Sequence, residues 1–140
     1  MTALKFYSAP TVDPNKFRVG TSPIGASIFK ILKGIQGELK LLDSETADAL
    51  QRTPSTFGTW NTSQSVSIST ERPSANDQII FAFIDIYDLI SALVYREEQR
   101  AEWVRKSNPA FGGKSPLDVM RNSAEDLFEL RHYLQRLINP

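Results

Sequence analysis

The chain has 140 residues, with 16 basic and 16 acidic side chains and no cysteine. This length fits one domain, or two small domains that share a core. A net charge of zero gives no general attraction to nucleic acid, although it permits a local basic patch. The lack of cysteine excludes disulfides, thiol nucleophiles and cysteine-based metal sites, and it fits a reducing compartment.

The N-terminal residues 1–26 have no sustained periodicity and contain several prolines and glycines, so we predict an irregular arm. The arm has no apolar stretch long enough for a secretion signal. The most apolar run of the chain, residues 79–94, contains two aspartates and is shorter than the roughly 20 residues of a membrane span. We therefore expect a soluble cytoplasmic protein.

Residues 27–72 show the pattern of short helices. Apolar side chains over residues 28–39 fall on one helical face. Asp43 or Ser44 is then a candidate N-cap for a short second helix, and a third short helix is predicted to begin near Pro54. Two short helices joined by a tight turn behind a first helix are the outline of a helix-turn-helix, so we predict a helix-turn-helix-like domain here.

Four residues of this domain are candidate DNA contacts, namely Arg52, Ser55, Thr56 and Asn61. Hydroxyl and amide groups can contact base edges, and arginine can contact phosphate. Arg52 is the only positive charge near these residues in the sequence, so little would drive the affinity. A structural or dimerisation role for the helix pair is therefore about as well supported as DNA reading.

The longest predicted helix runs from about residue 75 to 105 and begins with an acidic capping box at Ser74. The apolar residues of its first half, 79–94, cover most of the helix circumference. Such a helix is either the central post of a small bundle or a surface that packs against a second copy, and the sequence leaves both alternatives open. In its charged second half, we expect Arg96 and Arg100 to pair with glutamates of the same helix.

A loop and two further helices are predicted after the central helix. Asn108 precedes a proline and therefore ends the helix, and the following Gly112-Gly113 pair can adopt positive φ. Ser115 and Ser123 are typical N-caps of two successive helices. The acidic side chains just after Ser123 are best explained as partners of the helix dipole.

The Gly-Gly-Lys-Ser stretch resembles the end of a phosphate-binding loop, but the rest of the motif is missing. The position that requires the first glycine is Asn108, and the preceding segment is a charged helix instead of a buried strand. Pro116 also removes an N–H group from the start of the next helix. We interpret the stretch as a turn followed by a helix cap.

Catalytic and metal-binding patterns are not evident. His132 is the only histidine, and without cysteine it makes no recognisable zinc site. We expect a protein that is not an enzyme and has no cofactor and no metal. Phe111 is more informative, because it lies in a loop between a proline and two glycines. It either folds back into a groove between the flanking helices or anchors a partner protein.

The C-terminal stretch "NPAFGGKSPLDVMRNSAEDLFELRHYLQRL", with a tryptophan upstream, resembles the toxin-binding domain of the Xre/MbcA/ParS antitoxin family. The matching positions are Trp103, Asn108, Pro109, Phe111, Gly112, Gly113, Pro116, Leu117, Tyr133 and Leu134. The resemblance covers about residues 27–138 and is sharpest in the last third. Upstream, Thr56 and Trp60 are similar to a pair in the second helix of the family's helix-turn-helix.

The resemblance implies the antitoxin of a bacterial type II toxin–antitoxin pair. The partner it implies is a toxin with a RES domain, which consumes NAD or uses it for ADP-ribosylation. The antitoxin would bind over the NAD-binding cleft of the toxin and block it. The resemblance also implies a homodimer and, as an alternative role, repression of its own promoter by binding operator DNA.

We therefore predict an all-α helical bundle with three parts. These are the irregular arm at 1–26, the helix-turn-helix-like domain at 27–72, and a long central apolar helix with the toxin-binding domain at 73–140. Phe111 is expected to be an apolar anchor, and Arg131 and Arg136 are expected to supply polar contacts. The full set of expected toxin-binding residues is Asn108, Phe111, Gly112, Gly113, Lys114, Arg131, Tyr133 and Arg136.

Overall fold

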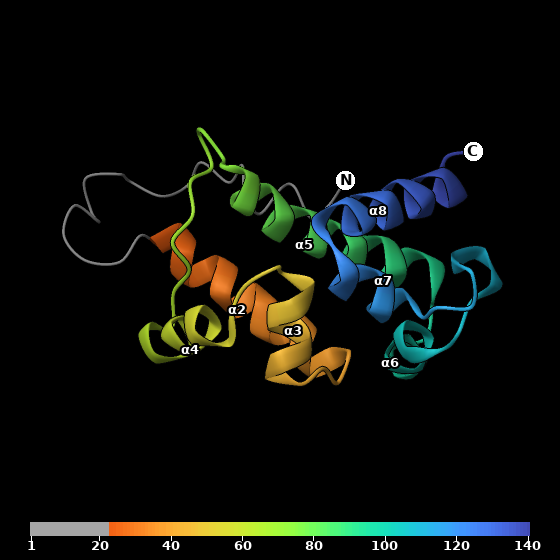
Figure 1. The fold of residues 1–140 in the computed structure, drawn as a ribbon, viewed down its shortest axis with the longest axis horizontal. Helices are drawn as coiled ribbons and strands as arrows, with labels where there is room; N and C mark the ends of the chain where they lie inside the picture. The colour runs from red at the N-terminus through yellow and green to blue at the C-terminus, as the bar shows by residue number, and fades with distance from the viewer. Residues whose placement is uncertain (1–22) are drawn as a thin grey trace.

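The computed structural model describes residues 23–140, and all regular elements in this part of the chain are helical (Figure 1). The predicted all-α class is confirmed. Most of the predicted arm lies outside the described residues, and the first described helix begins at Pro23, before the expected start. The elements are α2 (Pro23–Glu38), α3 (Asp43–Ala49), α4 (Pro54–Ser63), α5 (Ala75–Leu93), α6 (Glu97–Arg105), the 3-10 turn η2 (Pro109–Phe111), α7 (Pro116–Asn122) and α8 (Ala124–Ile138).

Helix α5 lies at the centre of the bundle. It runs alongside α8 and also contacts α2 and α6 (Figure 1). Its buried apolar side chains are Ile79, Ile80, Ala82, Phe83, Ile84, Ile86, Leu89 and Ile90. Burial within one chain therefore accounts for the apolar circumference, which favours the central-post alternative. Homodimerisation stays a prediction.

The predicted continuous helix over 75–105 is wrong. Helix α5 ends at Leu93, and the chain bends by 119° before the segment that begins at Glu97. The last carbonyls of a helix lack donors within the helix. Here the guanidinium of Arg100 donates to the carbonyl of Val94 at 2.9 Å and to that of Ser91 at 3.4 Å. Arg100 thus caps α5 from the following helix and stabilises the break.

The guanidinium of Arg100 also connects the turn between α5 and α6 to α2. Arg100 donates to the carboxylate of Glu38 with an N–O distance of 2.7 Å, and Glu38 also accepts a hydrogen bond from the hydroxyl of Tyr87. The expected pairing of Arg100 with glutamates of its own helix is therefore wrong. The ion pair is largely shielded from water, and it holds the end of α2 against the end of α5.

A second ion pair, in which the carboxylate is buried and the arginine is partly exposed, joins α3 to α6. The carboxylate of Glu45 accepts hydrogen bonds from Arg105 at 2.6 and 2.8 Å and one from the backbone N–H of Leu42 at 2.9 Å. The bonds from Arg105 lower the pKa of Glu45 to about 2, although burial opposes this shift. Leu42, and not the predicted Asp43 or Ser44, occupies the N-cap position of α3.

Three helix starts are capped as the sequence predicts. The hydroxyls of Ser74, Ser115 and Ser123 each accept a hydrogen bond, at 3.0 to 3.1 Å, from the backbone N–H three residues later. Each of these caps satisfies a donor that would otherwise lack a partner. Local sequence therefore fixes where α5, α7 and α8 begin.

The predicted domain division remains a prediction. Helices α3 and α4 are short and contact each other, as the helix-turn-helix outline requires, but α3 also contacts α7, and α2 contacts α5 and α6. Within the described part of the chain, no single helix is long and apolar enough to cross a membrane. Only α5 together with the segment 97–111 meets that criterion, and the chain is sharply bent between them.

Replacing Glu45 by Gln is expected to lower the free energy of unfolding by about 2 kcal/mol at pH 7, because Arg105 loses its buried anionic partner. The folded-state pKa of about 2 lies below the ordinary value of 4.5. The stabilisation is therefore complete above pH 4.5 and is lost as the pH falls toward 2. Urea unfolding at a series of pH values measures the difference between the two proteins.

Glu102→Gln is the matched control, since Glu102 is an exposed carboxylate on α6. We expect it to change the free energy of unfolding by no more than about 0.5 kcal/mol. Equal losses in the two variants would contradict the assigned role of the Glu45–Arg105 pair.

Candidate functional site

The loop between α6 and α7 is closed by its own hydrogen bonds. The backbone N–H groups of residues 110–114 all donate to oxygen atoms within the loop, at 2.9 to 3.2 Å. Gly112 and Gly113 have φ values of 65° and 87°, as predicted for this pair. Because its N–H groups point to its own carbonyls and to the side chain of Asn108, the loop is not a phosphate cradle. It is a pre-formed turn.

An aromatic contact fastens this loop to α8. The rings of Phe111 and Tyr133 meet edge to face, with centroids 5.2 Å apart and an interplanar angle of 75°. Such a pair contributes about 1 kcal/mol beyond the area it buries. Both side chains are half-buried. Phe111 therefore folds back onto a flanking helix, as one of the two alternatives supposed, but part of its surface stays accessible.

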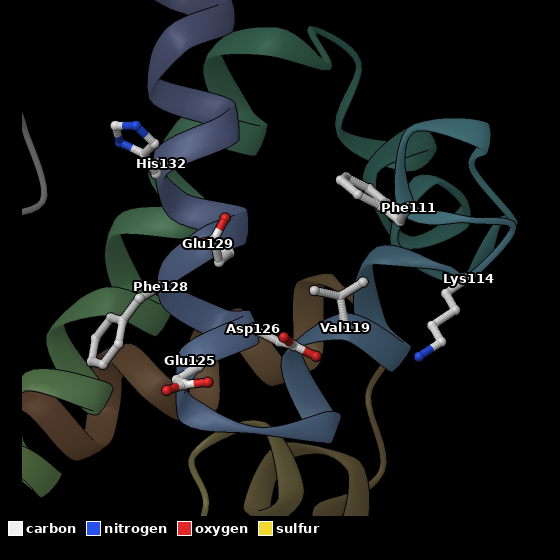
Figure 2. Close-up of a pocket in the computed structure, with 8 residues that line it drawn as sticks. All are labelled: Phe111, Lys114, Val119, Glu125, Asp126, Phe128, Glu129 and His132. Atoms are coloured by element: carbon white, nitrogen blue, oxygen red, sulfur yellow. The ribbon is translucent and has the colours of Figure 1, made fainter.

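A groove of about 800 Å³ lies between the loop, α7 and α8 (Figure 2). Figure 2 shows the ring of Phe111 directed toward α8, with Val119 of α7 below it. The residues that line the groove are Phe111, Lys114, Val119, Glu125, Asp126, Phe128, Glu129 and His132. The groove thus combines apolar side chains with three carboxylates and one ammonium group.

The structure brings together only some of the predicted toxin-binding residues. Phe111 and Lys114 line the groove, and Tyr133 lies beside Phe111. Arg136 is exposed but does not line the groove, and the guanidinium of Arg131 lies over the ring of Phe128 at 5.4 Å. The expected contact surface is therefore only partly one continuous site.

Arg131 is held by a carboxylate of the central helix. Its guanidinium lies 3.4 Å from the Oδ2 atom of Asp85, a side chain that is buried in α5. Burial raises the pKa of Asp85, and the nearby charge of Arg131 opposes this shift. The Oδ1 atom has no hydrogen-bond partner among the described residues. Arg131 therefore serves first to neutralise a buried charge.

The acidic residues of the groove were missed as site residues. Glu125 and Asp126 were explained as partners of the helix dipole, and Glu129 was not considered. Glu125, Glu129 and His132 are spaced by four and three residues, which places them on one face of a helix. That spacing is the sequence feature that could have identified them.

Most of the candidate DNA contacts are engaged within the chain. The guanidinium of Arg52 lies over the ring of Trp60 at 5.5 Å, and the amide of Asn61 donates to Asp43 at 3.4 Å. The hydroxyl of Thr56 accepts a hydrogen bond from that of Thr53, whereas Ser55 is exposed. DNA binding through these residues stays a prediction. The described residues also contain no cluster of acidic or histidine side chains that is arranged to hold a metal ion.

Residues 92–137 match the family of antitoxin Xre/MbcA/ParS C-terminal toxin-binding domains. The matched region starts at the end of α5 and contains α6, the closed loop, α7 and nearly all of α8. The resemblance in the last third of the chain is thereby confirmed, and the groove lies entirely within the matched segment.

A solved structure has a similar fold. One chain in the crystal structure of the M. tuberculosis MbcT-MbcA toxin-antitoxin complex superposes with a TM-score of 0.55 at 19% sequence identity. The alignment covers 80% of this chain and 94% of that chain. At this identity the likeness concerns the fold alone. No curated protein sequence matches the chain.

Replacing Arg131 by Met is expected to lower the free energy of unfolding by about 2 kcal/mol at pH 7, because the buried carboxylate of Asp85 loses its cation. Burial favours the protonated form of Asp85, so its pKa rises further in this variant. The deficit should therefore shrink as the pH falls and Asp85 takes up a proton. Chemical unfolding at several pH values measures it.

A double variant, Asp85→Asn with Arg131→Met, should recover much of the stability and lose this pH dependence. Arg136→Met is the control on the same helix, because Arg136 is exposed. A loss in Arg136→Met as large as that in Arg131→Met would show that the buried pair is not the cause.

Proposed function

We propose that the chain is the antitoxin of a toxin–antitoxin pair and neutralises its toxin by binding it directly. The observation that carries this proposal is the match of residues 92–137 to the antitoxin toxin-binding family. The closed loop and the groove against α8 support it, because they form a pre-organised surface within the matched segment. A surface that is already ordered loses little conformational entropy on binding.

Exposed apolar side chains also support this end of the molecule as the contact surface. Tyr95, at the turn between α5 and α6, is 90% exposed, and Leu137 near the end of α8 is 50% exposed. Large apolar side chains that are open to water are typical of interaction sites, and tyrosine is enriched among interface hot spots. We propose Tyr95 as an interface residue that sequence reasoning did not identify.

The finer assignments rest on the family resemblance. We propose that the toxin is of the RES type and uses NAD, and that the loop 108–115 and α8 lie over its active-site cleft. The antitoxin then acts by exclusion and needs no catalytic group, cofactor or metal of its own. We also propose that the antitoxin works as a homodimer.

Co-expression with the protein encoded by the adjacent reading frame tests the proposal. The two proteins should co-purify, and the antitoxin should relieve the growth arrest that the partner causes. If the partner neither binds nor arrests growth, the proposed function is wrong.

Tyr95→Ala should weaken the complex by about 2 kcal/mol, or roughly thirtyfold in Kd, because an exposed aromatic anchor is lost. Its effect on folding should be small, since the side chain is almost fully exposed. Leu42→Ala is the matched control, because Leu42 is 64% exposed just before α3 and lies outside the matched residues 92–137. Equal Kd values for the two variants would show that the interface lies elsewhere.

A further inference from the structure

The charged side chains that line the groove beside Phe111 are mainly acidic. From the sequence we expected basic polar contacts, supplied by Arg131 and Arg136. Three basic side chains of the neighbouring helices are already paired with carboxylates of the same chain, Arg105 with Glu45, Arg121 with Asp48 and Arg131 with Asp85. The carboxylates that line the groove, by contrast, remain at the surface. Their negative charge therefore decides what the groove attracts.

The two outermost carboxylates lie one helical turn apart. Glu125 and Glu129 are both exposed on α8, and neither forms an ion pair within the described part of the chain. Asp126 accepts a hydrogen bond from the amide of Asn122 at 2.6 Å and lines the same groove. Lys114 lines the groove from the loop, but no ion pair between its ammonium group and these carboxylates is present among the same residues.

The loop and α7 present two apolar side chains to the groove, beside Lys114. The ring of Phe111 and the side chain of Val119 are partly exposed and pack against the core. Figure 2 shows Asp126 and Glu129 on the side of α8 nearer to Val119. A ligand in the groove would therefore meet hydrocarbon on one side and negative charge on the other.

The apolar side chains and the carboxylates of the groove together restrict which kind of ligand can bind there. A metal ion is a poor fit, because no group of acidic and histidine side chains among the described residues is arranged to hold one. A wholly apolar segment would desolvate the carboxylates without compensation. A long basic side chain fits both walls, since its aliphatic stem can cover apolar surface while its charged end reaches the carboxylates.

We propose that this groove receives an arginine or lysine side chain of the toxin. Its stem would lie on Phe111 and Val119, and its charge would lie beside Asp126 and Glu129. This inference rests on the proposed antitoxin function, and polar contacts from Arg131 and Arg136 stay a separate prediction. Because the whole chain has no net charge, attraction of a basic partner would act locally and direct it to this end of the molecule.

The test compares two double variants that change the net charge equally. Glu125→Gln with Glu129→Gln removes two of the three carboxylates that line the groove, including that of Glu129, beside which the bound charge would lie. Glu98→Gln with Glu102→Gln is the matched control, with the same spacing on an exposed face of α6. Both are titrated calorimetrically with the protein encoded by the adjacent reading frame, at low and at high salt, after thermal unfolding has shown that their folds are intact.

We expect the groove variant to raise the Kd by at least about tenfold at low salt, and its binding to depend less on salt than that of the unmodified chain. The control variant should bind like the unmodified chain. A Kd unchanged in the groove variant, or raised equally in both variants, overturns the inference while leaving the proposed function intact. If the unmodified chain itself does not bind, the proposed function fails and the inference fails with it.

Discussion

The bidentate ion pair between Glu45 and Arg105 fixes the position of the C-terminal helices. Arg105 lies in α6, and Arg121 of α7 contacts the carboxylate of Asp48 at 2.8 Å, so α3 holds both helices. The loop 108–115 connects these two anchored helices, so its position is set from both ends. The ring contact between Phe111 and Tyr133 then fastens the loop to α8.

A second polar contact redirects the chain toward that arrangement. Arg100 satisfies carbonyls at the end of α5 and pairs with Glu38, so the helix stops and the chain turns into α6. Arg105 and Arg131 are also paired, with Glu45 of α3 and Asp85 of α5, so several arginines of the C-terminal segment are committed to the fold. The acidic character of the groove is thus a consequence of how the bundle is held together.

Several features that depend on residues close together in the sequence were predicted correctly. Features that depend on contacts between distant residues were not. The caps at Ser115 and Ser123 and the positive φ values of the glycine pair depend on a few neighbouring residues, and these predictions are confirmed. The break after α5 has no proline or glycine and depends on Arg100 reaching back across the turn. The orientation of Arg131 depends on Asp85, which lies on another helix, so no local pattern could reveal it.

The same charge distribution bears on which class of partner the chain can bind. At the helix pair α3 and α4, the guanidinium of Arg52 lies over Trp60, so the basic group that would contact phosphate is partly committed to packing. Affinity for nucleic acid is driven mainly by phosphate contacts. The opposite end offers a pre-formed loop, the exposed Tyr95 and an acidic groove, which are features of a surface for a protein with basic side chains. The physical chemistry of the single chain therefore favours a protein partner over DNA.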